Sequence, residues 1–558
     1  MHTLHSSLLE TRVIYSPPPR PSPFLVFYRK PISQNFIIIT LCSRGLSGTR
    51  LKSPKMGGSS GFIRGVLLDE SLLFAEDNNG NTFFQSGSES LLSRLQYSNL
   101  HTGISYQASV SPQKVIFLKE MAMLYSLDCF MLDTSALDAS VSEILQAWGD
   151  IGGSCLYVAS SKDDDLFLKL HGHGWLTVAK RKESGDGMED SEVMLINKLE
   201  ELPLTLCRLS RKVTGNNVVR VGYVMKASRE ADFAKRGAFP MNPTQNGLMF
   251  IPLTFDLPLE PQVHEVDVVF HKATDEITNI ELTGSSEYFN GISFSKGMQE
   301  LKRYCEDHPD CCVIDPLDKI YPVVDRLMIQ KLLAGLEELK TSGDCRIRAP
   351  HFLKVDSFNE PNMMERLSEA ELLLPSIVKP QVACGVADAH NMAIVFRTDD
   401  FLDLAVPLPA VIQEYVDHSA VLFKFYVLGD KVFHAVKNST PNSDVFLSSF
   451  EKDGLKPLSF NSLKSLPTAK GQIEASGLSS ADSTSLDLEL VTDAAHWLRK
   501  KLDLTIFGFD VVIQEGTRDH VIVDVNYLPS FKEVPTDVAI PAFWDAIKGA
   551  YESRRRHN

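Results

Sequence analysis

The chain has 558 residues, of which 44% are hydrophobic and 23% are charged. This length is too great for one hydrophobic core and predicts two to four domains of a globular protein. The net charge of −15 argues against general binding to nucleic acid or to anionic membranes. No apolar run approaches the roughly 20 residues that span a bilayer, so we expect neither an integral membrane protein nor a membrane partner.

The first 56 residues differ in charge from the rest. They contain eight Lys or Arg and one acid, Glu10, so the remainder of the chain carries −22. Such a basic, acid-poor leader resembles an organellar transit segment, but Met56 could equally be the working start. Nine cysteines without a C-x-x-C pair fit reduced thiols in an intracellular compartment. We expect a cytoplasmic protein, or a plastid protein if the leader is a transit segment.

From Gly61 to about Lys182, strand-like and helix-like pieces alternate, which predicts a parallel sheet with crossover helices. Their order resembles the haloacid dehalogenase-like superfamily, with Asp69 at the position of the nucleophile. Ser71 stands where that superfamily has its acid/base Asp, and Ala159-Ser160 replaces a late Gly-Asp that helps hold Mg²⁺. Without these carboxylates we expect a scaffolding or regulatory role for this domain, with no phosphoryl chemistry.

A charged linker, 180–190, and an apolar segment, 193–209, are expected to close this first domain. A second α/β pattern begins near Asn217, and residues 325–340 are expected to form an amphipathic helix. Strands are expected at SIVKP, MAIVF and VIQEY, followed by a hairpin over 420–439 that turns at Gly429-Asp430. The polar stretch 442–482 is poorly patterned and is expected to loop over the site.

Two carboxylates and a carboxamide come together in the stretch from Ile506 to Ser530, IFGFDVVIQEGTRDHVIVDVNYLPS. Its two β-branched halves flank a Gly516-containing turn, which predicts an antiparallel hairpin. A turn near Thr517 places Asp510 across from Asp524, and the pleat points Asn526 to the same face. Two solvated acids are the alternative interpretation, but an oxygen-only set of this kind suits Mg²⁺ held with nucleotide phosphates.

Neither a P-loop nor a Rossmann phosphate motif is present, so other residues must hold the nucleotide. Lys379 ends a predicted strand just before the turn around Gly385, a placement suited to phosphates. Pairing about Gly429-Asp430 puts Lys424 and Lys437 on one sheet face, which favours a bound polyanion over two snorkelling lysines.

Seven separated motifs occur in an order that is similar to one known family. They are VGYVM…R, VVFHK, VVDR, IVKPQVACG…H, VIQEYVDHSAVLFK, FGFDVVI and VIVDVNYLPSF. This set resembles the inositol tetrakisphosphate 1-kinases, also called inositol 1,3,4-trisphosphate 5/6-kinases, which are ATP-grasp enzymes. The resemblance runs from about Val219 to the C-terminus, and the added N-terminal domain resembles the long plant type.

The resemblance implies overlapping sets of site residues. The implied catalytic residues are Lys379, His390 and Lys424. The implied ATP-binding residues are Arg326, Lys379, Gln413, Glu414, Val416, Lys437 and Ser439. The implied substrate-binding residues are Arg229, Lys272, His390, Lys424, Asn526 and Ser530. The implied Mg²⁺ ligands are Asp510, Asp524 and Asn526.

Several positions depart from the family pattern. Arg229 replaces the usual lysine, Cys384 stands where many members have His, Asn438 interrupts a basic-Pro-Ser motif, and Ser530 replaces a Gly. These changes surround the expected substrate and loop, so they put substrate choice in doubt more than nucleotide binding.

The expected fold class is therefore α/β, with an ATP-grasp kinase domain preceded by a degenerate haloacid dehalogenase-like domain. The expected boundaries are 1–56 for the leader, 57–210 for the first domain, 218–330 for the substrate-binding part and 331–558 for the ATP-grasp parts. The expected activity is transfer of the ATP γ-phosphoryl group to an inositol tris- or tetrakisphosphate by a monomer with Mg²⁺. A carboxylate-amine ligase and a catalytically weak inositol-phosphate sensor are the alternatives. The isomer and the hydroxyl phosphorylated stay open.

Overall fold

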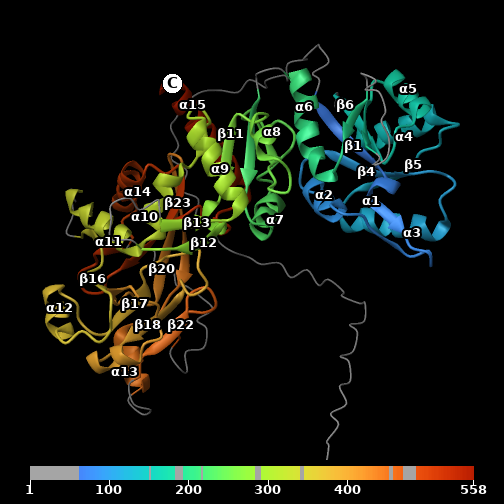
Figure 1. The fold of residues 1–558 in the computed structure, drawn as a ribbon. Helices are drawn as coiled ribbons and strands as arrows, with labels where there is room; N and C mark the ends of the chain where they lie inside the picture. The colour runs from blue at the N-terminus through green and yellow to red at the C-terminus, as the bar shows by residue number, and fades with distance from the viewer. Residues whose placement is uncertain are drawn as a thin grey trace, which may run out of the picture. The chain divides into compact units, whose positions relative to one another are not determined.

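The computed structural model describes residues 62–149, 153–181, 193–214, 218–282, 291–339, 345–450, 456–468 and 486–557 (Figure 1). The predicted leader, 1–56, lies outside the described residues, as does most of the predicted charged linker. None of the helices within the described ranges combines the length and apolar character needed to cross a membrane. All eight cysteines in the described part are free thiols, in agreement with the expected reduced state.

The first part of the chain forms a six-stranded parallel sheet in the order β5-β4-β1-β6-β7-β8. Its strands are β1 (Ile63–Asp69), β4 (His101–Tyr106), β5 (Asp128–Met131), β6 (Ser154–Ala159), β7 (Leu176–Lys180) and β8 (Met194–Ile196). A two-stranded ribbon, β2 (Phe74–Glu76) with β3 (Thr82–Phe84), follows the short helix α1 (Glu70–Leu73). The predicted alternation of strands and helices is confirmed.

Helices cover both faces of this sheet because neighbouring residues of a strand point to opposite sides. Leu68 belongs to the core with α2 (Ser88–Leu95), α3 (Pro112–Leu124) and α6 (Leu202–Thr214). Leu67 belongs to the core with α4 (Leu137–Trp148) and α5 (Asp164–Gly172) on the other face. The 3₁₀ turn η1 (Leu199–Glu201) and α6 pack on the first core, as predicted for the apolar segment 193–209.

The next part contains a four-stranded parallel sheet in the order β10-β9-β11-β14. Its strands are β9 (Val219–Val224), β10 (Leu248–Pro252), β11 (Val268–His271) and β14 (Val313–Ile314). The helices between them are α7 (Ala227–Lys235), α8 (Leu259–Val263) and α9 (Lys296–Asp307). The 3₁₀ turn η3 (Ala273–Asp275) and a small ribbon, β12 (Ile277–Ile280) with β13 (Ile292–Phe294), follow β11.

Two further five-stranded sheets make up the rest. One has the order β16-β19-β17-β18-β22 and is antiparallel throughout. Its strands are β16 (Phe352–Val355), β17 (Ser376–Pro380), β18 (Asn391–Val395), β19 (Ala410–Glu414) and β22 (Leu458–Asn461). The helix α12 (Met363–Glu369) packs on it, and the 3₁₀ turn η6 (Thr398–Asp403) lies between β18 and β19.

The other sheet, in the order β15-β24-β23-β20-β21, carries the acidic hairpin. Its strands are β15 (Ile347–Arg348), β20 (Val421–Leu428), β21 (Lys431–Asn438), β23 (Ile506–Ile513) and β24 (His520–Tyr527). It shares one continuous core with the parallel β9–β14 sheet and with α10 (Leu317–Val324), α11 (Arg326–Leu333), α14 (Leu488–Leu502) and α15 (Thr536–His557). The residues of the hairpin are therefore held by the largest core of the chain.

Two local predictions were wrong. The stretch 442–482 is not a plain loop in its described portions, because it contains α13 (Ser443–Phe450) and β22, which pairs with β18. The helix predicted over 325–340 ends at Leu333 and continues as a 3₁₀ turn, η5 (Ala334–Glu338). Gly335 lies in this turn, and a glycine weakens a helix at such a point.

Asp325 precedes α11 and ties it to the loop after β17. Its buried carboxylate accepts the backbone N–H groups of Leu327 and Met328, at 2.8 and 3.4 Å, and the amide of Gln381, at 3.1 and 3.0 Å. Both helix-capping donors and the buried amide therefore depend on one side chain.

Replacing Asp325 with Ala should lower the free energy of unfolding by about 2–3 kcal/mol, since three buried donors lose their acceptor. Urea unfolding followed by circular dichroism measures the change. Asp318→Ala, which removes an exposed carboxylate from the first turn of α10, is the matched control. Equal stability of the two variants would contradict this role of Asp325.

Candidate active site

Asp510 on β23 and Asp524 on β24 are paired directly across the hairpin, as predicted. Asn526 follows on the same face, and its amide donates to Oδ2 of Asp524 at 3.0 Å. The pKa of Asp510 is raised to about 6, chiefly by burial and also by the neighbouring charge of Asp524, against the opposing effect of Lys424. The hairpin therefore holds a concentrated negative charge that favours a cation.

Lys424 on β20 completes a row of three charged residues across adjacent strands. It lies opposite Asp510, and its Nζ donates to both carboxylate oxygens at 2.8 Å. The only hydrogen bond that the described residues give Asp524 through its side chain comes from the Asn526 amide. Asp510 thus has a lysine partner, while Asp524 can still accept further hydrogen bonds.

The oxygen set of Asp510, Asp524 and Asn526 fits a hard divalent cation. Within the described ranges, no cluster of three His, Cys, Asp or Glu side chains is arranged to hold a metal. Two carboxylates and an amide are nevertheless sufficient protein ligands for Mg²⁺, which keeps several waters and takes phosphate oxygens from its nucleotide.

Lys379 reaches this hairpin from the other five-stranded sheet. It ends β17, and its Nζ donates to the carbonyl of Val523 at 3.1 Å. Burial lowers the pKa of Lys379 to about 8, although the nearby Asp524 favours its charged form. A cavity of only about 10 Å³ remains between Lys379, Gln413 and Asp524, room for no more than one water. The described arrangement therefore leaves no room for a nucleotide between these three side chains.

Arg326 lines the same cavity, but its guanidinium is engaged by the chain itself. It donates to the carbonyls of Pro380, Val382 and Ala389 at 2.7, 2.9 and 3.1 Å. Its contacts hold the loop between β17 and β18 in place. Its Nε is buried without a partner among the described residues.

The end of β19, which was expected to face adenine, is held by a residue that was not predicted from the sequence. Arg348 on β15 donates to both carboxylate oxygens of Glu414, at 2.8 and 2.9 Å, and to the side chain of Gln514 at 2.8 Å. Gln514 belongs to the turn of the acidic hairpin, so Arg348 links the two sheets. The buried Gln413 precedes Glu414, and its side-chain oxygen lies 3.4 Å from the Gln330 amide nitrogen.

His418 engages two of the predicted nucleotide-binding residues. Its Nδ1 lies 2.6 Å from the carbonyl oxygen of Val416, and its Nε2 lies 2.7 Å from Oγ of Ser439. Sequence analysis placed Val416 and Ser439 near the nucleotide but missed the histidine between them, which lies within the motif VIQEYVDHS.

The predicted substrate-binding cations have internal anionic or carbonyl partners. Arg229 forms two hydrogen bonds with Asp275, at 2.9 and 3.1 Å. Lys272 donates to the carbonyl of Tyr527 and lies 4.7 Å from the centre of its ring. The pKa of Lys272 is lowered to about 8, chiefly by burial and also by the neighbouring charge of Arg229. Lys272 therefore lies beside the residue that follows Asn526.

Glu533 is an acidic residue of this region that sequence analysis missed. It lies 2.5 Å from Nζ of Lys437 and accepts the Tyr426 hydroxyl at 2.7 Å. Lys424 and Lys437 share one sheet face, as predicted, and each has a carboxylate partner. The sequence indicated acidic partners for these lysines only through the net charge of −22 outside the leader.

The remaining predicted residues, His390 and Ser530, lie in segments next to the acidic hairpin and its facing sheet. Nδ1 of His390 is 3.2 Å from Oγ of Ser462, which follows β22, and burial lowers the pKa of His390. Ser530 is partly exposed in the segment beyond β24. Gly385, in the loop before His390, has φ +86, and a Cβ there would lie 2.8 Å from Ile277. This turn consequently requires glycine.

The first domain has a degenerate centre of its own at Asp69. Oδ1 of Asp69 accepts the backbone N–H of Ser71 at 3.1 Å and also the Ser71 hydroxyl, while Oδ2 accepts the Tyr157 hydroxyl at 3.1 Å. Oγ of Ser71 lies 2.6 Å from Oγ of Ser160. Neutral hydroxyls therefore surround the carboxylate where the superfamily pattern has further acids.

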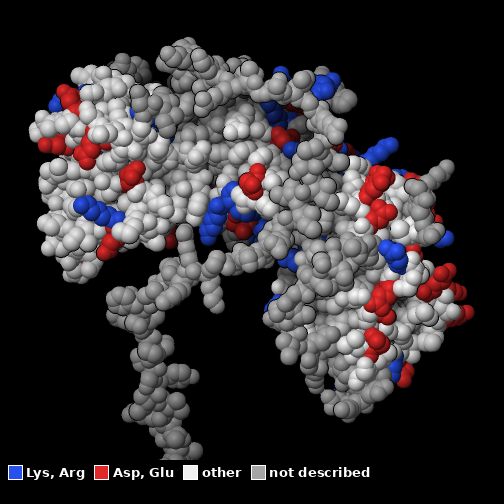
Figure 2. Space-filling model, turned by 180° about the vertical axis from the view of Figure 1, so that it is seen from behind, with Lys and Arg blue, Asp and Glu red and all other residues white. Residues whose placement is uncertain are grey.

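Charged side chains of both signs are dispersed over the face in Figure 2, without one extended basic surface on the described part of that face. The two five-stranded sheets that meet at Lys379 and Asp524, with the acidic hairpin, define an ATP-grasp fold. Comparisons with known families agree. Residues 341–544 match the inositol 1,3,4-trisphosphate 5/6-kinase ATP-grasp domain, and residues 220–320 match the pre-ATP-grasp domain. Residues 56–212 match the ITPK4 N-terminal HAD-like domain.

Similar proteins extend the comparison over most of the chain. It is 50% identical to inositol-tetrakisphosphate 1-kinase 6 of Oryza sativa subsp. indica over 493 residues, covering 88% of this chain and 89% of that protein. It is 29% identical to inositol-tetrakisphosphate 1-kinase of Danio rerio, over 52% of this chain and 69% of that protein. The chain belongs to the inositol 1,3,4-trisphosphate 5/6-kinase family, which confirms the resemblance and the predicted fold class.

Among solved structures, VanG D-Ala:D-Ser ligase from Enterococcus faecalis is 17% identical and covers 60% of this chain and 100% of that chain. The TM-score of this comparison is 0.36.

Replacing Lys379 with Met should stabilise the fold and abolish function. Below pH 8 the folded state keeps a charged amine out of water, so its removal should raise the free energy of unfolding by up to about 3 kcal/mol at pH 7. The gain should shrink as the pH rises from 8 towards 10.4, where the unfolded lysine also loses its proton. Turnover should fall at least about 100-fold.

Urea unfolding at pH 7 and pH 10, together with ADP release, measures these effects. Lys464→Met, at an exposed lysine, should change neither. A destabilised Lys379→Met protein would contradict the unfavourable burial of this charge.

Proposed function

We propose that the chain transfers the γ-phosphoryl group of ATP to a ring hydroxyl of an inositol tris- or tetrakisphosphate. The observation that carries this proposal is the opposed pair Asp510 and Asp524, with Lys379 entering from the facing sheet and Lys424 beside it. Family membership supports the same reaction class.

The nucleotide would lie between the two five-stranded sheets. Asp510, Asp524 and Asn526 would hold Mg²⁺, which when bound supplies charge neutralisation at the β- and γ-phosphates. Lys379 would contact the phosphates from β17, and Arg326 would support the loop that covers them. Gln413, Glu414 and Val416 would offer their backbone groups to adenine, with Lys437 and Ser439 on the nucleotide side. Fixed charges in such a site lower the barrier without forming covalent bonds to the substrate.

The inositol phosphate would bind on the side of Arg229, Lys272 and His390. Asp275 orients Arg229, and the Tyr527 carbonyl orients Lys272, so both cations are placed before the substrate arrives. Because burial lowers the pKa of His390, its ring is neutral near pH 7 and can donate one N–H to a phosphate. Lys424, Asn526 and Ser530 would complete the pocket nearest the transferred group.

Several finer features belong to the same proposal. Mg²⁺ is the expected metal, the protein acts as a monomer, and neither nucleic acid nor membrane is a partner. Its compartment is the cytoplasm, or the plastid if residues 1–55 act as a transit segment.

Replacing Asp524 with Asn should lower ADP formation at least about 100-fold, because the carboxylate without a lysine partner is lost from the metal site. The assay follows ADP and the new phosphomonoester with a panel of inositol polyphosphates and saturating Mg²⁺. Asp430→Asn, at the exposed turn of the neighbouring β20–β21 hairpin, should retain full activity. Near-normal turnover of Asp524→Asn would remove the metal assignment, and ADP with free phosphate and an amide product would support the ligase alternative.

Replacing Asp69 with Ala should leave kinase turnover unchanged within about twofold, since its carboxylate is satisfied by Ser71 and Tyr157 and lacks the acids that phosphoryl chemistry needs. Steady-state kinetics of the full chain measures this. A large loss of kcat with an unchanged melting temperature would show that the first domain contributes to the reaction.

A further inference from the structure

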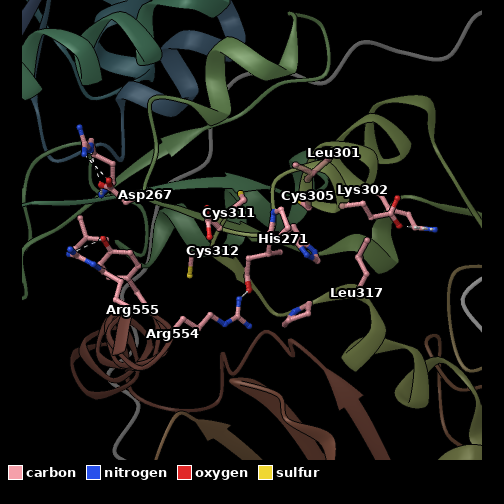
Figure 3. A pocket seen from close by; sticks show the side chains of 18 of the residues that line it. Asp267, His271, Leu301, Lys302, Cys305, Cys311, Cys312, Leu317, Arg554 and Arg555 are labelled. Atoms are coloured by element: carbon pink, nitrogen blue, oxygen red, sulfur yellow. Dashed lines mark hydrogen bonds and ion pairs between the residues drawn. The ribbon is translucent and has the colours of Figure 1, made fainter. Parts of the chain in front are cut away.

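A second, much larger cavity lies away from the ATP-grasp site. Its volume is about 1,090 Å³, and its walls come from β9, β11, β14, α9, α10 and the C-terminal helix α15 (Figure 3). It shares no lining residue with the cavity between Lys379 and Asp524. Its size is slightly above the usual range of about 300–1,000 Å³ for sites of small organic ligands, so such a ligand would fit.

The acidic residues of this cavity are mostly neutralised. Asp267 accepts two hydrogen bonds from the Arg220 guanidinium, both at 2.8 Å. The carboxylate of Glu306 lies 3.7 Å from Lys302, and that of Asp318 lies 3.7 Å from Lys319. These acids therefore leave little negative charge to repel an anionic ligand.

Two adjacent arginines of α15 have no such partner. Arg554 donates to the carbonyl of Val313, and Arg555 lies 3.4 Å from the Tyr551 hydroxyl and 5.7 Å from the centre of its ring. In the described part of the chain, no carboxylate forms an ion pair with either arginine. Arg220, whose side chain is 8% exposed, also has a buried Nη1 without a partner there. The cavity wall thus has more cationic donors than acceptors.

The wall formed by α9 and α10 contains apolar side chains beside the charged Lys302 and Glu306. Met298 and Leu301 of α9 and Leu317 of α10 line it, together with three free thiols, Cys305, Cys311 and Cys312. Burial raises the pKa of Cys312 to about 11, so this thiol is neutral. Figure 3 shows Cys305 beside Leu301 on α9, and Cys311 and Cys312 between this helix and the two arginines of α15. A ligand that touches both walls has to be amphipathic.

We propose that this cavity binds a small organic anion, with its phosphate or other oxyanion group at Arg554 and Arg555 and its apolar body along α9 and α10. Planar guanidinium groups bind such oxyanions through paired hydrogen bonds, and apolar walls with a few placed donors are usual in ligand sites. The proposal is independent of the kinase assignment, because the two sites have no residue in common.

The test uses the full chain and 1-anilinonaphthalene-8-sulfonate, which joins a sulfonate to an aromatic body. Fluorescence titration should give one saturable site. Arg555→Ala should weaken it about tenfold, since one charged hydrogen-bonding group is lost. Arg556→Ala is the matched control, because Arg556 lies next on the same helix but does not line this cavity.

The thiols report the location of the probe. Alkylation by N-ethylmaleimide, followed peptide by peptide with mass spectrometry, should slow at Cys305, Cys311 and Cys312 when the probe is bound. Cys345, which lies outside the cavity, should react at an unchanged rate. Inorganic phosphate alone should protect the thiols less than the probe, since it has no apolar body. Unchanged affinity in Arg555→Ala, or equal alkylation of the three thiols with and without the probe, would overturn the proposal.

Discussion

The repulsion between two carboxylates in adjacent strands is the constraint on which the catalytic part of this protein depends. Asp510 and Asp524 face each other within a well-packed hairpin, so the charge cannot be relieved by moving the strands apart. Lys424 offsets one carboxylate directly, and Lys379 lies near the other. Removing Lys424 would therefore leave the buried carboxylate of Asp510 without its ion-pair partner.

The same balance extends to cations that are proposed to hold the inositol phosphate and the nucleotide. Arg229 is held by Asp275, and Lys437 is held by Glu533, so an acidic protein keeps its cations ordered by pairing them internally. An inositol polyphosphate brings far more negative charge than these single carboxylates. It can compete for the cations without requiring them to search for a new conformation, which is the benefit of placing them in advance.

The alternation of side chains along a strand explains why much of the arrangement of the two hairpins could be predicted from the sequence. Once the turn at Gly429-Asp430 is fixed, the alternation of side chains places Lys424 and Lys437 on one sheet face. Asp510 lies opposite Asp524 because the register of the acidic hairpin shifts by one residue between Asp510 and Val511, an irregularity that alternation alone does not predict. This alternation does not indicate which distant segments supply interaction partners. The contacts made by Glu533, by Arg348 and by the carbonyls around Arg326 could therefore not be predicted from the sequence. The helix α13 and the edge strand β22 were missed because segments of eight and four residues are too short to show a clear hydrophobic period.

If the nucleotide enters between the sheets as proposed, the contact between Lys379 and Val523 links its entry to the uptake of a proton. In the closed arrangement, burial keeps the Lys379 pKa near 8, so at mildly alkaline pH much of the population is uncharged there. Separation of the sheets hydrates the amine and restores its ordinary basicity, so the amine takes up a proton from solvent. The positive charge that attracts an entering polyphosphate therefore grows in the act of opening.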